Sequence, residues 1–234
     1  MNKSMLIALL VVLCGFCPQA INRPDLQVVK AAEGQMDVFL DKIEPGQEAI
    51  YGFTNEDDKD LCDIGKPYRV LELKKEFFDS KQLAENTDYI SIKNEWRAPV
   101  MIKGQYRALL TVSGYPGNYS VSSLGDPGLA RELQQKATGV NESDEYYILR
   151  IYPLLAEFFV HEGDNSFINA QFIPLESAVK AIPALSVSKK TAYTLTEVEQ
   201  MVKEALTKNT KETTPAPKKT APKKTTPKKN VVVQ

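Results

Sequence analysis

Few residues of this sequence could carry covalent chemistry. The chain of 234 residues has a single histidine, His161, and three cysteines. One histidine excludes zinc sites that need several imidazole ligands. Cys62 could pair with His161 as nucleophile and base, but Asp60 and Asp63 flank Cys62 and raise the pKa of its thiol, which opposes reactivity. We therefore interpret Cys62 as an ordinary, partly buried thiol and His161 as a structural residue.

A run of carboxylates is the other group of side chains that could bind a metal or take part in a reaction. Its members could bind calcium, but the ligand spacing and central glycine of an EF-hand loop are absent. No Gly-x-Ser-x-Gly, P-loop or dinucleotide-binding pattern occurs. We expect a solvated acidic loop, no metal site, no cofactor and no catalytic residues. The alternative is a hydrolase that brings two carboxylates with shifted pKa values into one pocket. The carboxylates of the loop are Glu56, Asp57, Asp58, Asp60 and Asp63.

Aromatic side chains are dense between residues 89 and 119. Tyrosine and tryptophan often form recognition platforms because they combine a large apolar area with a polar group. These side chains are therefore a candidate partner surface, and the alternative is that they fill the core of a small sheet. The set is Tyr89, Trp96, Tyr106, Tyr115 and Tyr119.

The C-terminal end is strongly basic, in contrast to the acidic body. Residues 203–234 hold 9 Lys and 2 Glu, whereas residues 21–202 hold 19 Lys and Arg against 28 Asp and Glu. Recurrent proline forbids a helix and favours an extended spacer. We expect residues 209–234 to be a disordered cationic tail, either a plain spacer or an attachment to a polyanion. The polyanion-binding candidates are Lys218, Lys219, Lys223, Lys224, Lys228 and Lys229.

The N-terminal residues have the layout of a secretory signal peptide. Lys3 is followed by an apolar run at residues 5–16 and by a small residue, Ala20. The run is shorter than the ~20 apolar residues that cross a bilayer. We expect export and removal of residues 1–20, which places the protein in the periplasm, at the cell surface or outside the cell. A retained anchor and lipidation of Cys14 or Cys17 are the alternatives.

The expected export limits the partners of the basic tail. An anionic envelope polymer or lipid headgroups are the polyanions that an exported protein meets, and each lysine near an anionic membrane contributes roughly 1 kcal/mol. Nucleic acid is not expected, because the tail has no arginine or aromatic residue to read or stack on bases.

The elements that must position these residues are mostly strands. Alternating and β-branched patterns bounded by Gly, Pro, Asn and Asp predict strands, and caps with apolar spacing of three and four predict helices. Residues 44–47 have the Pro-Gly order of a type II turn. The predicted strands are residues 35–43, 48–53, 68–73, 96–102, 105–112, 119–124, 146–152, 156–161 and 166–173. The predicted helices are residues 74–83, 127–138, 175–182 and 194–208.

This order predicts an α+β fold: a mostly antiparallel sheet containing a meander, with two or three helices on one side, followed by the disordered tail. A partly closed barrel fits the same order. The predicted organisation is a signal peptide at 1–20, a globular domain at 21–185, a linker and amphipathic helix at 186–208, and the tail. Thr194 and Glu197 form a capping box for that helix, whose apolar stripe packs on the body or faces a partner.

The function expected from the sequence is that of an exported, non-enzymatic binding or structural module. Its cationic tail would provide weak electrostatic attachment to an anionic envelope or surface polymer. The alternative is an inhibitor or chaperone-like regulator of another exported protein, which would use a sheet edge or the aromatic surface.

Overall fold

The computed structural model describes residues 24–80, 89–138, 145–161 and 167–212. The predicted signal peptide, the end of the helix predicted at residues 74–83 and the lysine pairs of the tail lie outside the described residues. Within the described ranges, no helix combines the length and apolar character needed to cross a membrane.

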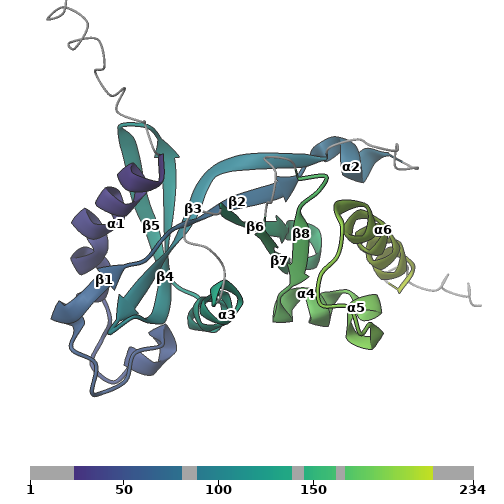
Figure 1. The fold of residues 1–234 in the computed structure, drawn as a ribbon. Coiled ribbons are helices and arrows are strands. Elements are labelled where there is room, and N and C mark those ends of the chain that lie inside the picture. The colour runs from purple at the N-terminus through teal and green to yellow at the C-terminus, as the bar shows by residue number, and fades with distance from the viewer. Residues whose placement is uncertain (1–23, 81–88, 139–144, 162–166, 213–234) are drawn as a thin grey trace, which may run out of the picture.

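A mostly antiparallel sheet of eight strands runs through the molecule (Figure 1). Its strands are β1 (Cys62–Ile64), β2 (Tyr68–Leu73), β3 (Ile90–Ile102), β4 (Gln105–Tyr115), β5 (Asn118–Gly125), β6 (Tyr146–Ile151), β7 (Ala156–His161) and β8 (Gln171–Pro174). Their order is β5-β4-β3-β2-β6-β7-β8, and β1 pairs with β3 off this path. Neighbours are antiparallel except β2 and β6, which are parallel. The expected α+β class is confirmed, and the path of the sheet is open rather than closed into a barrel.

The helices are more numerous than the two or three expected: six are found within the described residues. They are α1 (Pro24–Leu40), α2 (Lys75–Asp79), α3 (Pro127–Ala137), α4 (Glu176–Ala181), α5 (Pro183–Val187) and α6 (Leu195–Glu212), with short 3-10 turns η3 (Glu48–Tyr51), η4 (Lys59–Leu61) and η5 (Tyr152–Leu154).

Two lobes share the long strand β3 (Figure 1). Residues 95–102 of β3 pair with β4, and residues 90–97 pair with β2. We call α1, β1, β4, β5 and the second half of β3 the N lobe. The C lobe comprises the first half of β3 with β2, β6, β7, β8, α2, α4, α5 and α6. The lobes meet at the waist, where Trp96 and Arg97 of β3 pair with both β2 and β4.

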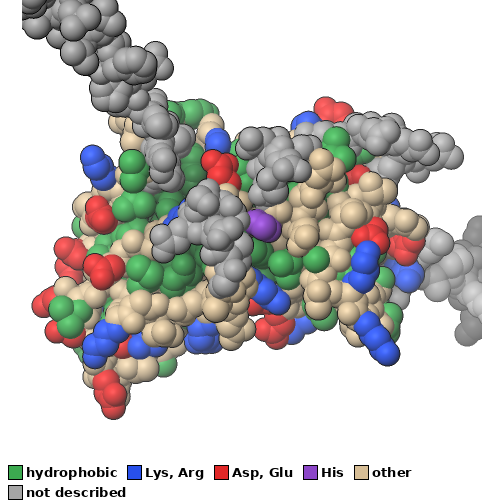
Figure 2. Space-filling view, in the orientation of Figure 1, with side chains coloured by type: hydrophobic (Ala, Val, Ile, Leu, Met, Phe, Trp, Pro, Cys, Tyr) green, Lys and Arg blue, Asp and Glu red, His purple; other side chains and the backbone are tan. Residues whose placement is uncertain are grey.

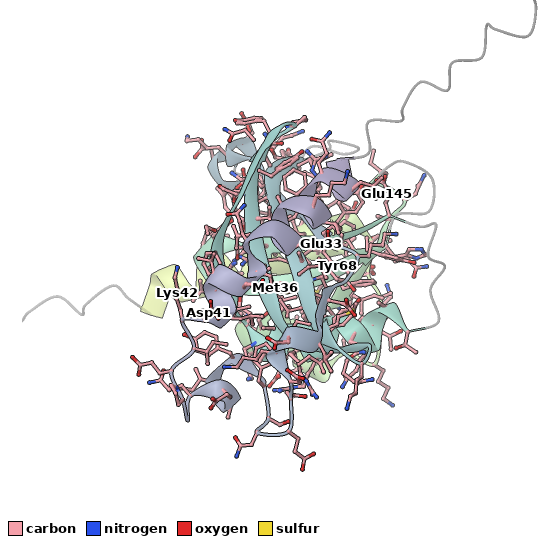
Figure 3. All side chains as sticks on the ribbon, turned by 90° about the vertical axis from the view of Figure 1, so that its left-hand side faces the viewer. Glu33, Met36, Asp41, Lys42, Tyr68 and Glu145 are labelled. Atoms are coloured by element: carbon pink, nitrogen blue, oxygen red, sulfur yellow. The ribbon has the colours of Figure 1, made fainter. Side chains whose placement is uncertain are left out.

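The N lobe begins with a helix where the sequence predicts a strand at residues 35–43. Its buried residues recur every four positions, at Val28, Ala32, Met36 and Leu40. That spacing places one apolar stripe on a helix, and the stripe packs on the meander. The strand prediction was wrong because the short window that starts at residue 35 contains only the last turns of this stripe. Figure 3 shows Glu33 and Met36 on α1, in front of the sheet.

The segment after α1 also differs in part from the prediction. The type II turn is confirmed: Gln47 N–H donates to Glu44 O over 2.9 Å, and Gly46 has φ 88. Residues 48–53, predicted as a strand, instead form η3, which Gly52 ends in the left-handed conformation. η3 has no fully buried residue, so this segment lacks the half-buried alternation of a sheet strand.

The meander predicted between residues 89 and 124 is confirmed, with longer strands. Lys103 and Gly104 both have positive φ (51 and 73), which a two-residue turn of type I′ requires, and they join β3 to β4. β3 continues back to Ile90 as one strand because β2 pairs with its first half.

Helices cover both faces of the sheet, not one face as expected. On β4, Ala108 and Leu110 face the core under α1, while Leu109 packs with Ala130 and Leu133 of α3. Successive side chains of a strand point to opposite faces, so the continuous buried run at residues 108–112 of β4 requires a cover on each face.

The helix predicted after Asp126 begins at Pro127, as expected, but its cap is different. Asp126 has a left-handed backbone (φ 54) and no side-chain capping bond. Its carboxylate instead lies 3.8 Å from a guanidinium nitrogen of Arg97. Asp126 therefore occupies the N-cap position, where its carbonyl oxygen accepts from Ala130 N–H over 2.9 Å, but its side chain pairs with Arg97 and does not cap the helix.

The C lobe largely follows the prediction. β2, β6 and β7 lie where expected, β8 is shorter than residues 166–173, and α5 occupies the start of the predicted linker. The capping box of α6 is confirmed, because Thr194 N–H donates to a Glu197 carboxylate oxygen over 2.9 Å and Glu197 N–H donates back to Thr194 Oγ1 over 3.4 Å. α6 packs its apolar stripe into the C-lobe core. The buried residues of the stripe are Leu195, Val198, Val202 and Ala205.

Candidate functional site

The aromatic residues predicted as a partner surface are distributed over three hydrophobic clusters. Tyr89 lies in the C-lobe core, and Tyr106 packs under α3. Trp96 belongs to the N-lobe core, where its ring meets that of Tyr119 edge to face at 5.1 Å. Tyr115 is 66% exposed. The structure does not bring these residues into one surface, and four of them contribute to packing.

Cys62 and His161 lie on different parts of the sheet. Cys62 is half-buried on β1, and burial, followed by the charges of Asp57 and Asp63, raises the pKa of its thiol to about 11. His161 is on β7, where its ring stacks on Tyr146 at 5.6 Å. Since β3, β2 and β6 separate β1 from β7, the two residues do not form a nucleophile–base pair.

The acidic loop is held by bonds within the protein. Asp57 accepts from Thr54 N–H over 2.7 Å and pairs with Arg107 at 2.8 Å. Partial burial acts to raise the pKa of Asp57, but these donors outweigh it and lower that pKa. Asp58 caps η4 by accepting from Asp60 N–H. Among the described residues, no three His, Cys, Asp or Glu side chains are placed to hold a metal ion.

Two carboxylates have raised pKa values, the feature that a hydrolase would require. Burial raises the pKa of Glu157, which lies 3.6 Å from Arg150. Burial also raises the pKa of Glu132, which accepts the N–H of Glu176 over 2.8 Å. Glu157 on β7 and Glu132 on α3 therefore each have a structural partner within the protein.

A shallow cleft of about 100 Å³ opens at the waist. It lies where the first residues of the parallel pair β2 and β6 approach β3. We call it the waist cleft. Its lining residues are Lys66, Pro67, Arg69, Trp96, Glu145, Tyr146 and Tyr147.

Arg69 is the central cation of the waist cleft. It is the register partner of Trp96 on β3 and of Tyr147 on β6. Its guanidinium lies over the Trp96 ring at 5.1 Å, a cation–π geometry. Nε donates to Lys93 O over 3.0 Å and one Nη donates to Asn94 Oδ1 over 3.3 Å. The plane of the guanidinium is therefore fixed by one ring and two acceptors.

Arg69 differs from the other partly buried arginines in its charge partners. Arg97 pairs with Glu95 at 3.2 Å, Arg107 with a carboxylate at 2.8 Å, and Arg150 with Glu157 at 3.6 Å. No carboxylate pairs with Arg69 among the residues that the structure describes. A held guanidinium with N–H groups left over is a site for a carboxylate, sulfate or phosphate group.

A second cation lies at the edge of the waist cleft. Lys66 Nζ lies 5.0 Å from the centre of the Tyr146 ring. Tyr146 is stacked in turn on Phe159 at 5.5 Å and is almost fully buried. Glu145, which Figure 3 labels at the margin of the molecule, holds the Tyr147 hydroxyl by a short hydrogen bond. The aromatic rings of the waist cleft thus orient its cations and offer little free face to a ligand.

The waist cleft was missed in the sequence because its residues come from three distant segments. Arg69 was read only as one position of an alternating strand. The signal that could have singled it out is a cation on a strand whose neighbouring positions are buried. Its register partner Tyr147 comes from β6, and a parallel pairing leaves no local sequence signature.

Searches against protein-family models, curated proteins and solved structures give no match to this chain.

Proposed function

We propose that this chain is an exported, non-enzymatic binding module that holds an anionic envelope or surface polymer. The waist cleft takes one anionic group of the polymer, and the lysine-rich C-terminus adds weak, salt-sensitive attachment to the same polymer. The observation that carries the proposal is Arg69, a held guanidinium that pairs with no carboxylate within the described ranges.

The chemistry of the waist cleft favours a carboxylate, sulfate or phosphate group. Arginine presents its N–H groups in a rigid fork that matches such groups in bidentate geometry. Because Trp96, Lys93 O and Asn94 already hold the guanidinium, little side-chain entropy is lost on binding. Lys66 adds a second positive charge at the edge.

The size of the waist cleft favours one group of a larger molecule over a whole small ligand. Its volume of about 100 Å³ falls below the range of about 300–1,000 Å³ for small-molecule pockets. Additional affinity must come from elsewhere, and a polymer that also meets the tail lysines supplies it through effective concentration.

The test is binding to polygalacturonate, a carboxylated polysaccharide, by the chain without residues 1–20 over a salt series. Arg69→Gln is expected to weaken binding roughly tenfold to a hundredfold, since a charge-assisted hydrogen bond contributes about 1.5–3 kcal/mol. Arg69→Lys keeps the charge but lacks the forked guanidinium, so its affinity is expected to lie between those of the wild type and Arg69→Gln. Replacing the six paired tail lysines by Gln is expected to lower the salt dependence instead.

Arg131→Gln is the matched control, because Arg131 is an exposed arginine on α3 outside the waist cleft. It removes the same charge without touching the waist cleft. If Arg69→Gln and Arg131→Gln lowered binding equally, the loss would reflect net charge alone, and the waist cleft would not be the site.

A further inference from the structure

The start of β3 is paired on one side only. β2 pairs with β3 at residues 90–92, whereas the pairing of β3 with β4 begins at Glu95, opposite Ser113. β4 continues beyond this point as Gly114 and Tyr115, which pair with β5. Figure 1 shows β3 running on beside β2 from the N lobe into the C lobe. Residues 91–94 of β3 therefore have no strand on the β4 side within the described ranges.

The backbone groups of Ile92 and Asn94 point to this open side. Tyr89 O accepts Lys74 N–H over 2.7 Å, and Lys93 O accepts a side-chain bond from β2, so both carbonyls lie on the β2 side. Backbone groups of successive strand residues point alternately to the two sides. The amides and carbonyls of Ile92 and Asn94 thus point away from β2, and the described part of the chain gives them no backbone partner.

A trough of about 330 Å³ follows this edge where β4 diverges from β3. We call it the β3 trough. Residues 91–95 of β3 line it, together with Glu72 of β2 and with Ser113 and Tyr115 of β4. Its volume lies within the range of about 300–1,000 Å³ that ligand pockets occupy. Unpaired backbone groups and a concavity therefore occur at the same place.

The charged side chains of the β3 trough are paired within the protein. Lys93 Nζ lies 3.0 Å from a carboxylate oxygen of Glu72, and Glu95 lies 3.2 Å from Arg97. These pairs leave little net charge to attract a charged partner. Ile92 is 45% exposed and lines the same trough. The β3 trough therefore favours an uncharged segment with an apolar residue beside Ile92.

The exposed apolar side chains of the N lobe offer no comparable surface. Leu26, Val38, Ile50 and Leu61 are each at least 55% exposed, and none of them lines a pocket among those found in the described part of the chain. Figure 2 shows hydrophobic side chains on the N lobe interspersed with charged ones. Scattered exposed apolar residues are normal on protein surfaces, whereas Ile92 lies beside unpaired backbone groups.

We infer that the β3 trough docks an extended, uncharged segment of another protein, which adds a short strand antiparallel to β3. The backbone of the segment pairs with Ile92 and Asn94, and a β-branched side chain of the segment packs on Ile92. A second copy of this chain is a poorer occupant. If two β3 edges paired around Ile92, Tyr89 of the second copy would lie opposite Glu95, where Ser113 already pairs.

Proline substitutions separate docking from folding. Proline lacks an N–H and is tolerated in a strand where that N–H faces outward. Ile92→Pro is therefore expected to keep the pairing with β2 and to block the added strand. Ser91→Pro removes an N–H on the β2 side, so it is expected to lower the urea midpoint more than Ile92→Pro does. Ile92→Val keeps the N–H and the β-branched side chain, and is the matched control.

The probe is a dye-labelled peptide of alternating valine and threonine between Gly-Ser ends, measured by fluorescence anisotropy with the chain lacking residues 1–20. Residues paired through backbone hydrogen bonds have side chains on the same face, so the valine amides are expected to face β3. N-methylation of the valine amides is expected to weaken binding at least tenfold, and N-methylation of the threonine amides to leave it nearly unchanged. Ile92→Pro is expected to weaken binding about tenfold, and Ile92→Val to leave it unchanged.

Three results would overturn the inference. The first is no binding of the unmodified peptide at about 1 mM. The second is equal binding of the two N-methylated peptides, which would show that backbone pairing is not involved. The third is a dimer of the chain that Ile92→Pro dissociates, without peptide binding, which would make a second copy the occupant. Arg69→Gln is expected to leave peptide binding unchanged, so this test and that of the waist cleft fail independently.

Discussion

The two lobes build their cores from different kinds of contact. In the N lobe, β3, β4 and β5 follow one another through short turns, and α1 covers their apolar face. In the C lobe, the central pairing joins β2 to β6 in parallel, with Arg69 opposite Tyr147. The meander of the N lobe therefore depends on pairings between neighbours in sequence, whereas the centre of the C lobe depends on one distant pairing. The waist cleft forms where these two arrangements meet.

The lobes also protect their sheet edges differently. In the N lobe, the side chain of Gln35 on α1 accepts the outward N–H of Val121 on β5 over 3.1 Å. In the C lobe, Tyr193, just before α6, pairs with Phe172 of β8 through two backbone hydrogen bonds of 2.9 Å. Both devices occupy backbone groups that an edge strand would otherwise offer to another chain. They leave fewer free backbone groups at the sheet edges for the addition of a strand from another chain.

The largest predicted effect tests whether the lobes fold as one unit. Phe158 on β7 is fully buried in the C-lobe core, so Phe158→Ala is expected to lower the free energy of unfolding by about 3–5 kcal/mol. The single tryptophan, Trp96, lies in the N-lobe core and reports on that lobe. Because the lobes share β3, we expect Phe158→Ala to lower the urea midpoint by the same amount whether unfolding is followed by Trp96 fluorescence or by far-UV circular dichroism.

The reciprocal change is Leu110→Ala, which empties a fully buried position of the N-lobe core. It is expected to cost about 2–5 kcal/mol and to shift both signals together as well. A Trp96 transition that stayed in place after Phe158→Ala, while the circular dichroism transition moved, would mean that the lobes unfold independently.

The next effect concerns the joint between the N lobe and α3. A Cβ on Gly52 would lie 2.2 Å from Arg107 O and 2.6 Å from Pro127 Cβ, and Gly52 has φ 83. Gly52→Ala is therefore expected to lower the free energy of unfolding by about 2–4 kcal/mol, from backbone strain and overpacking together. Gly46 has a similar φ of 88 but open space around it, so Gly46→Ala measures the strain alone, about 1–2 kcal/mol. Equal losses of unfolding free energy at both glycines would show that the residues of η3, β4 and α3 around Gly52 move enough to accommodate a Cβ.

The contrast between the lobes explains which parts of the fold could be predicted. The meander was read correctly because its turn residues, such as Lys103 and Gly104, specify a local hairpin. α1 was read in part as a strand because a window of nine residues shows too little of the stripe that starts at Val28. The order of β2 next to β6 could not be read, because the intervening chain does not specify which strand lies beside a parallel partner.

The same reasoning applies to the candidate sites. Trp96 and Tyr119 were selected for their residue type, but their rings pack against each other in a core. Arg69 was passed over although it holds the central place in the waist cleft, since its partners come from β3 and β6. Burial and charge pairing across distant segments decided these outcomes, and neither is visible in local spacing.

The smallest predicted effect is a pH dependence centred on Glu157, which faces charges from both lobes. Burial raises its pKa more than Arg150 on β6 and Arg97 on β3 lower it, and Asp126 and Glu132 act in the raising direction. A carboxyl group whose pKa is higher in the folded state binds more protons when folded. Stability therefore falls as the pH rises from the unfolded value, about 4.3, to the raised value.

Glu157→Gln removes this titration. As the pH rises through this window, the free energy of unfolding of the variant is expected to increase relative to that of the wild type, and above the window the difference is expected to stay constant. Urea unfolding of both proteins from about pH 4 to pH 8 measures the difference. Glu33→Gln, an exposed carboxylate of the N lobe, controls for the loss of one surface charge. If the variant instead became less stable relative to the wild type as the pH rose, the ion pair of Glu157 with Arg150 would outweigh burial in setting the pKa of Glu157. The charged groups at the waist would then hold the lobes together, since Arg97 and Arg150 approach Glu157 from strands on either side of β2.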